Sequence, residues 1–269
     1  METKKRSVIL SCGFNLISAT VGHVYIGRPL RGLSIILSGF LVLMLFGWAG
    51  ASTTLWSFYA AQSTYIAIYL ILIIDGGVLA YKRKGYTLKR YNKWYIYFIL
   101  ILMVIFLNSL LFSYRGLVFG FDNHRVVSMN MAPLMKTGDF IATDTRNCLF
   151  GNNPNRGDII SFLYPKDPSV IYIKRVIALP GEKVFIKDGR LYINGSVIDE
   201  PYVPNTSNIK YYSQDMYEIL IPDNHLFVLG DNRDNSNDSR FWGFLPIENV
   251  VGRVTLIWYS KDFSRIGNI

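Results

Sequence analysis

The sequence predicts a two-part membrane protein, in which N-terminal transmembrane α-helices are followed by a mainly-β domain on the extracytoplasmic side. Hydrophobic residues make up 51% of the 269 residues, and the mean hydropathy is +0.24, which is too apolar for an ordinary soluble enzyme. Long uncharged runs fill the first part, whereas short β-prone runs separated by Gly, Pro, Asn and Asp fill the second. We therefore predict a membrane domain of three to four hydrophobic segments over residues 1–115 and a β-rich domain over residues 116–269.

Three apolar runs are each about 20 residues long, enough for a helix to cross roughly 30 Å of hydrocarbon. They are Leu33 to Ala51, Ser63 to Tyr81 and Tyr95 to Tyr114. The loop from Lys82 to Lys93 (KRKGYTLKRYNK) is densely basic, which by the positive-inside rule predicts a cytoplasmic location. The third run then leads outward, and everything after Arg115 lies outside the cytoplasm.

Two places in the first part break this simple pattern. Val8 to Gly27 is apolar but has basic residues on both sides, so both of its flanks favour the cytoplasm. It is either a hairpin or interfacial helix, or a spanning helix that starts outside. Asp75 interrupts the second run and is followed by two glycines, which we interpret as a helix irregularity rather than a proton relay.

The second part contains seven runs that predict strands and several explicit turns. The strands are Asp158 to Phe162, Val170 to Ala178, Lys183 to Ile186, Arg190 to Ile193, Glu218 to Ile221, His225 to Leu229 and Val250 to Trp258. Asp188-Gly189 and Asn194-Gly195 are typical of tight hairpins, and Pro180-Gly181 ends a strand. Pro201 to Asp215, rich in Asn, Ser and Tyr, predicts a surface insertion.

Charge and cysteine content exclude several classes of function. The net charge of +9 comes from basic residues beside apolar runs rather than on an aromatic-interleaved stripe, so we expect no nucleic-acid partner. Cys12 and Cys148 lie far apart in different parts of the chain, which argues against an internal disulfide. The three histidines show no metal-ligand spacing, and we predict neither a metal nor a cofactor.

Three stretches of the β-rich part carry the candidate chemistry. Val126 to Asp139 (VVSMNMAPLMKTGD) predicts an exposed turn between β-prone runs. Lys174 lies in an apolar strand, where a lysine is a snorkelling cation, an ion-paired cation or a desolvated amine able to act as a general base. Gly230 to Gly243 (GDNRDNSNDSRFWG) can form a buried ion-pair network that offers hydroxyls to a neighbouring amine, or a polar loop capped by Trp242.

Together these stretches resemble the type I signal peptidases, Ser/Lys-dyad membrane endopeptidases that remove signal peptides outside the cytoplasmic membrane. The family turn is Ser-Gly-Ser-Met-x-Pro-Thr-Leu-x-x-Gly-Asp, and Lys174-Arg175, Pro180-Gly181 and the run from Gly230 to Arg240 match its other blocks. The resemblance covers about the last 150 residues. It implies a signal-peptidase-like β fold, no cofactor, and a multi-pass location in the cell (inner) membrane.

The resemblance also implies partners and residue roles. Its partners are signal peptides of exported preproteins, the lipid bilayer and, as a candidate, a second competent peptidase. Lys174 is the general base, Ser236 orients its amine, and Ser128 is the first serine of the turn. The supporting ion pairs are formed by Arg175, Asp231, Asp238 and Arg240. The substrate is contacted by Met131 and Pro133.

The place of the nucleophilic serine falls on Asn130, whose carboxamide cannot form an acyl-enzyme. Three interpretations follow. Ser128, about 6.6 Å away along an extended strand, replaces the nucleophile through a bulge. Alternatively, the protein is a silent homologue that binds signal peptides or membrane proteins without cleaving them. The third interpretation is a structural membrane protein whose outer domain retains the fold.

Overall fold

The structure is a computed structural model that describes residues 3–4, 6–82, 85–87, 91–149, 151–207 and 209–269. Contacts within the chain define two compact units. The first comprises residues 1–51 and 56–119, and the second comprises residues 52–55 and 120–269. Helix α6 (Arg115–Phe119) begins at the last residue of the predicted membrane domain and belongs to the first unit.

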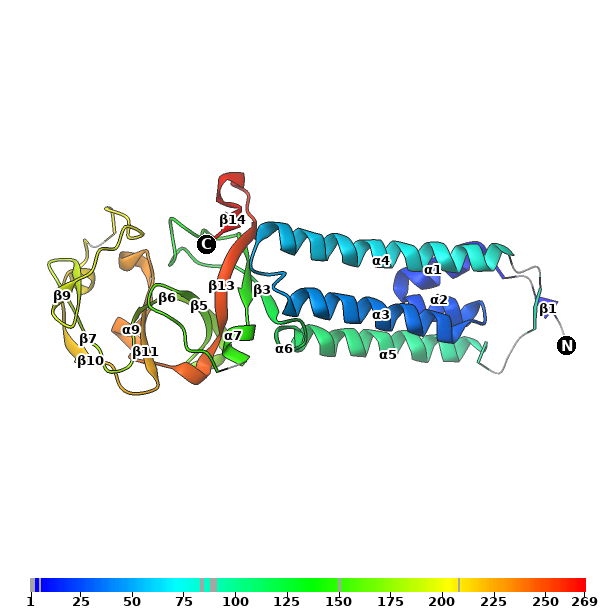
Figure 1. Ribbon diagram of the computed structural model, residues 1–269, viewed down its shortest axis with the longest axis horizontal. Coiled ribbons are helices and arrows are strands. Elements are labelled where there is room, and N and C mark those ends of the chain that lie inside the picture. The colour runs from blue at the N-terminus through cyan, green and yellow to red at the C-terminus, as the bar shows by residue number, and fades with distance from the viewer. Residues whose placement is uncertain (1–2, 5, 83–84, 88–90, 150, 208) are drawn as a thin grey trace. The chain divides into compact units, whose positions relative to one another are not determined.

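Three long helices form most of the first unit (Figure 1). They are α3 (Pro29–Trp48), α4 (Leu55–Lys82) and α5 (Trp94–Ser113), and each is long and apolar enough to cross a membrane. They overlap the three predicted runs, although α3 ends at Trp48 rather than Ala51 and α4 begins at Leu55 rather than Ser63. The short strands β1 (Thr3–Lys4) and β2 (Tyr86–Thr87) pair antiparallel in the same unit.

The segment from Val8 to Gly27 folds as two short helices rather than one spanning helix. Helix α1 (Val8–Ile17) and helix α2 (Ala19–Tyr25) are separated by Ser18, whose backbone is extended at φ −165° and ψ 132°. Ten residues of helix rise about 15 Å, half of what the hydrocarbon core requires. The structure thus agrees with the hairpin alternative.

Helix α4 is continuous through Asp75, so the predicted irregularity there is wrong. The two following glycines instead let α1 approach closely. A Cβ on Gly76 would lie 1.9 Å from Asn15 Nδ2, and Ser11 Oγ donates to Gly76 O at 3.0 Å. Asp75 accepts from Arg31 Nη2 at 2.6 Å and contacts His23 Nε2 at 3.0 Å, so its charge is matched by partners on α3 and α2.

Two antiparallel sheets form the second unit (Figure 1). The larger has the order β12-β11-β6-β5-β13-β4-β3, with β14 paired to β13, and the smaller has the order β10-β7-β8-β9. The larger sheet comprises β3 (Phe121–Arg125), β4 (Phe140–Asp144), β5 (Ile159–Tyr164), β6 (Asp167–Ala178), β11 (His225–Leu229), β12 (Leu245–Pro246), β13 (Val250–Tyr259) and β14 (Gly267–Asn268). The smaller comprises β7 (Lys183–Lys187), β8 (Arg190–Ile193), β9 (Ser196–Val197) and β10 (Met216–Leu220).

All seven predicted strands are present, and the two predicted hairpin turns have the expected backbone. Asp188 and Gly189 have φ of 49° and 71°, and Asn194 and Gly195 have φ of 50° and 79°. Positive φ at both central residues is what a type I′ turn requires, and it matches the twist of the flanking strands. Strand β3 was not predicted, because its sequence FDNHR is polar.

Short helices connect the strands of this unit. They are α7 (Arg146–Leu149), α8 (Tyr211–Gln214), α9 (Ser239–Trp242) and the 3₁₀ turns η1 (Arg233–Asn235), η2 (Ile247–Asn249) and η3 (Phe263–Arg265). Side chains from the strands build three buried apolar clusters. One of them, around Ile141, Ile159 and Val254, lies beneath the predicted turn and receives two of its methionines.

Candidate functional site

The turn from Val126 to Asp139 is a closed loop. Val126 N donates to Asp139 O, and Gly138 N donates back to Val126 O, both at 2.8 Å. The Asp139 carboxylate accepts from Lys136 N at 2.8 Å and pairs with Arg265 at 2.9 Å. The apolar side chains of Met131 and Met135 are 1% and 0% exposed, because they pack into the cluster below. The loop is thus anchored at both ends and underneath.

Within this loop, Ser128 does not lie on an extended strand. Strand β3 ends at Arg125, Ser128 and Met129 form a bend, and a turn begins at Asn130. The strand geometry that underlay the predicted 6.6 Å displacement and bulge is therefore wrong. Ser128 and Pro133 are exposed, and Asn130 is half-buried, whereas Met131 is part of the core. Substrate binding by Met131 and Pro133 stays a prediction.

Backbone contacts fasten Asn130 to the loop that begins at Gly230. Asn232 N donates to Asn130 O at 3.0 Å, and Asn232 Nδ2 donates to Met129 O at 3.1 Å. A Cβ on Gly230 would lie 2.5 Å from Asn130 O and 2.3 Å from Ser236 Oγ, closer than real Cβ atoms approach. Glycine at 230 therefore lets the Asn130 carbonyl and the Ser236 hydroxyl both lie close against its backbone.

Lys174 is fully buried in the middle of β6, at 0% exposure. Its neighbour Arg175 pairs with Leu229 at the end of β11, so Lys174 lies next to the start of the Gly230 loop. Burial lowers the pKa of the amine to about 8, and the nearby charge of Arg240 acts in the same direction, whereas Asp238 and Asp231 oppose it. The amine is therefore desolvated, whereas its role as a general base stays a prediction.

In the described part of the chain, the Lys174 amine is not hydrogen-bonded to the side chains predicted to act with it. Lys174 Nζ donates to Ile173 O at 3.3 Å and lies 5.3 Å from the centre of the Tyr172 ring. Among the described residues, no hydrogen bond joins Nζ to the side chain of Ser128, Asn130 or Ser236. Ser236 is 7% exposed, and its Oγ has no hydrogen-bond partner in the part of the chain that the structure describes.

The four residues predicted to support the site form two bidentate ion pairs. Arg175 donates to both carboxylate oxygens of Asp231, at 2.8 and 2.6 Å. Arg240 does the same with Asp238, at 2.8 Å to each oxygen. Asp238 also accepts from Gly230 N at 3.1 Å, so this pair positions the loop backbone directly. Bidentate geometry fixes both partners in orientation as well as in distance.

Other residues, not singled out from the sequence, complete the site. Arg233 is 1% exposed and pairs with Glu200, which comes from the segment after β9. Asp234 accepts from Ile209 N and Lys210 N at 2.9 and 3.2 Å, and so fastens the predicted insertion to the Gly230 loop. The only indication of this pair in the sequence was the position of Arg233 within the charged run from Gly230 to Gly243. The spacing of the residues did not identify Glu200 as its partner.

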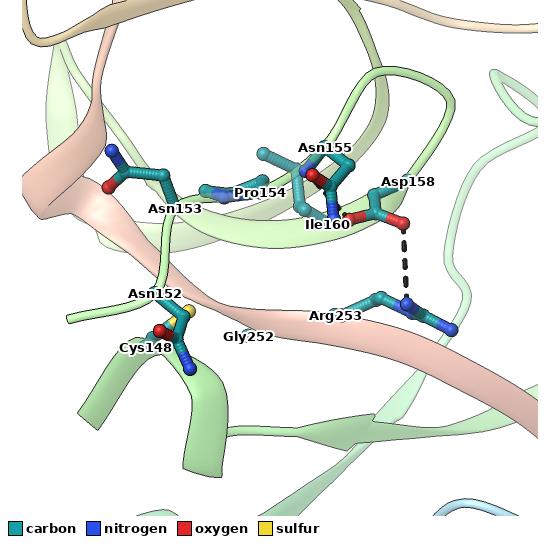
Figure 2. A pocket seen from close by; sticks show the side chains of 9 residues that line it. All are labelled: Cys148, Asn152, Asn153, Pro154, Asn155, Asp158, Ile160, Gly252 and Arg253. Atoms are coloured by element: carbon teal, nitrogen blue, oxygen red, sulfur yellow. Dashed lines mark hydrogen bonds and ion pairs between the residues drawn. The ribbon is translucent and has the colours of Figure 1, made fainter. Parts of the chain in front are cut away.

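Two pockets of the second unit are lined by neither Lys174 nor Asn130. Figure 2 shows one of about 360 Å³, in which the dashed line joins Asp158 to Arg253. It is lined by Cys148, Asn152, Asn153, Pro154, Asn155, Asp158, Ile160, Gly252 and Arg253. The other, of about 550 Å³, lies beside β8 and β9 and includes Glu200. Among the described residues, no group of three or more His, Cys, Asp or Glu is placed to hold a metal ion.

Comparisons with known proteins identify the family of the chain. Residues 93–259 match the family model of signal peptidase, peptidase S26. Signal peptidase I of Pseudomonas aeruginosa is 32% identical over 250 residues, covering 72% of this chain and 84% of that protein. The probable signal peptidase I-1 of Synechocystis is 35% identical over 169 residues, covering 60% and 81%.

A crystal structure of a signal peptidase I from Enterococcus faecalis is 39% identical to this chain. The match covers 38% of this chain and 97% of the Enterococcus faecalis chain, with a TM-score of 0.35. The family model spans more than half of the present sequence, and it includes the turn, the lysine strand and the Gly230 loop. The chain therefore belongs to the signal peptidase family, peptidase S26.

Proposed function

We propose that the protein is a membrane-bound endopeptidase of the signal peptidase I type, which removes signal peptides from exported preproteins. Membership of the family supports signal-peptide removal. The observation that carries the proposal is the buried amine of Lys174, with its pKa lowered to about 8. At pH 7 about one such amine in ten is neutral, against about one in three thousand for an ordinary lysine, so a competent base is available.

In the proposed reaction, Ser128 supplies the hydroxyl. Lys174 Nζ accepts the proton from Ser128 Oγ while Oγ attacks the scissile carbonyl. The resulting ammonium then gives its proton to the departing amine, and water hydrolyses the acyl-enzyme with Lys174 as base again. Ser236 Oγ, buried and unpartnered among the described residues, is available to orient the amine. Ser128 is exposed and is not hydrogen-bonded to Lys174 among the described residues, so this reaction requires its Oγ to come within reach of the amine when peptide binds.

Asn130 favours a second candidate function, a homologue that binds signal peptides or membrane proteins without cleaving them. In this candidate the carboxamide occupies the place of the attacking hydroxyl, and the ion pairs and loop contacts serve binding alone. Loss of the nucleophile in a serine protease reduces the rate about a million-fold in one measured case, because binding and the oxyanion hole are all that remain. Such a loss would abolish ordinary turnover.

We further propose a multi-pass location in the cell membrane with the β-rich unit outside the cytoplasm. The densely basic loop after α4 favours a cytoplasmic location by its composition, although residues 83–84 and 88–90 lie outside the described part. Residues 52–55, which join α3 to α4, belong to the second unit. Thr255 Oγ1 donates to Ser52 O, and Leu55 N donates to Asn268 Oδ1 at 3.2 Å. These bonds support a location of the α3–α4 loop and the β-rich unit on the same side of the membrane. Three membrane-spanning helices would give that arrangement.

A cleavage assay on a detergent-solubilised preprotein tests the two candidates together. The first predicts cleavage by the native protein that is abolished by Lys174→Ala and by Ser128→Ala. The second predicts an inert native protein that still binds the signal peptide and gains cleavage in Asn130→Ser. Asn205→Ser, at an exposed position of the insertion, is the matched control and leaves either result unchanged. An inert native protein and an inert, folded Asn130→Ser variant, neither binding signal peptide, would refute both.

A further inference from the structure

Glu200 lies outside the three stretches that match the family, yet it forms an ion pair almost as buried as that of Asp238 and Arg240. Its side chain is 8% exposed and that of its partner Arg233 is 1% exposed. Arg233 Nη1 donates to Glu200 Oε2 at 3.0 Å, and Nη2 donates to Oε1, so the pair is bidentate. A buried arginine without a partner would be costly, so this contact determines where Arg233 can lie.

The pair acts on the backbone of Gly230. Arg233 Nε donates to Gly230 O at 3.2 Å, while Asp238 accepts from Gly230 N at 3.1 Å. Both polar groups of this residue are therefore bound by members of ion pairs. Because Gly230 contacts Ser236 Oγ and Asn130 O, its position sets theirs.

Tyr202 connects the same segment to the strand that bears Lys174. Its hydroxyl donates to Glu200 Oε1 at 2.8 Å, and its ring lies 3.9 Å from the guanidinium carbon of Arg175. Arg175 follows Lys174 directly and pairs with Asp231. A cation stacked on an aromatic ring is attracted by the ring face and is shielded from water on that side. The Glu200 segment thus contacts the network on two sides.

We infer that Glu200 is a positioning residue of the site, which acts through Arg233 to hold Gly230 and so keeps the Gly230 loop packed against the Lys174 amine. The role does not require contact between Glu200 and substrate. It also does not depend on whether the protein cleaves, since it concerns the environment of Lys174. The charged groups that act on this amine are Asp238, Arg240 and Asp231, and the test leaves all three unchanged.

The test removes the pair without leaving a buried charge, in the variant Glu200→Gln/Arg233→Met. Replacing both members of a buried pair is often neutral for stability, so we expect the variant to fold. The readout is the pH dependence of Lys174 acylation by acetic anhydride, resolved by peptide mass spectrometry on the full-length protein in detergent. We expect the midpoint to rise by about one pH unit, because a loosened loop admits water to the amine.

The matched control is Lys183→Gln/Glu218→Gln, which removes an exposed pair and should leave the midpoint unchanged. A folded Glu200→Gln/Arg233→Met variant with the native midpoint overturns the inference. Should that variant not fold, Glu200→Asp decides, because the shorter side chain keeps the charge but cannot reach Arg233 with the same geometry. A raised midpoint in Glu200→Asp supports the inference, and a native midpoint refutes it. Acylation needs no turnover, so failure here is distinguishable from failure of the proposed function.

Discussion

At the scale of single residues, the arginines explain why Lys174 remains an unpaired amine beside two carboxylates. Asp231 is bound on both oxygens by Arg175, and Asp238 is bound on both by Arg240. Neither carboxylate is left to neutralise the lysine, so burial dominates and the pKa falls. A carboxylate freed from its arginine would pair with the amine and raise its pKa.

Lys174→Met should stabilise the fold at neutral pH. The lysine pKa falls from 10.5 to about 8 on folding, so below pH 8 the folded state bears the full cost of a buried charge, about 3 kcal/mol. Between pH 8 and 10.5 the unfolded state binds more protons, so stability of the native protein rises with pH. The gain in the variant should therefore shrink toward pH 10.5.

Denaturant unfolding in detergent at several pH values measures this gain. Lys183→Met is the control. The Lys183 side chain is 57% exposed, so its charge stays hydrated on folding and carries no burial cost. A Lys174→Met variant less stable than the native protein at pH 7 would show that Lys174 is charged and paired in the fold.

At the scale of elements, local chemistry was predictable and close packing was not. The Asp-Gly and Asn-Gly turns define their hairpins because few other residues adopt positive φ in succession. The Asp75-Gly76-Gly77 sequence looked like a helix break for the same reason, yet the glycines serve packing against α1. Whether a glycine breaks a helix or admits a neighbour depends on a partner distant in sequence.

Gly76→Ala should displace α1 from α4. The new Cβ would lie 1.9 Å from Asn15 Nδ2, so α1 must shift, and Cys12, whose Sγ contacts Ile73 O at 3.8 Å, loses its cover. We expect alkylation of Cys12 by a membrane-permeant maleimide to accelerate several-fold. Cys148 provides an internal standard.

Gly13→Ala is the matched control for this experiment, because its added Cβ meets no atom within 4 Å. Equal Cys12 rates in the native protein and in Gly76→Ala would mean that α1 and α4 do not pack as described.

Much of the candidate site followed from the sequence, but its outer layer did not. Asp238 and Arg240 lie two residues apart in one motif, so their pairing was predictable from spacing. Lys174 and Arg175 come from a different stretch than Asp231, and their proximity to it followed from the family resemblance. Glu200 meets Arg233 across a separation of 33 residues, and no local pattern indicates it. The bend at Ser128 was also missed, because the preceding valines suggested a strand that ends earlier, at Arg125.

At the scale of the whole molecule, the loop between α3 and α4 constrains the topology. Ser52 to Leu55 belongs to the β-rich unit through hydrogen bonds to β13 and β14, although its flanking helices belong to the other unit. We therefore predict that this loop and the β-rich unit lie on the same side of the bilayer. The positive-inside rule gives the same arrangement independently.

Cysteine labelling of intact cells tests this arrangement. In a Cys12→Ser/Cys148→Ser background, Thr54→Cys and Lys210→Cys should both react with a membrane-impermeant maleimide added from outside. Gly85→Cys, between α4 and α5, should react only after the cells are lysed. Labelling of Gly85→Cys in intact cells, or protection of Thr54→Cys, would contradict the proposed topology.

The closed loop from Val126 to Asp139 also has an evolutionary consequence. Its shape depends on backbone bonds at its ends and on Met131 and Met135 below, and no described hydrogen bond uses the side chain at position 130. That position can therefore drift without loss of the fold, and selection on stability would not resist the change. Because asparagine and serine codons differ by one base, a lineage could exchange the two side chains in a single mutational step.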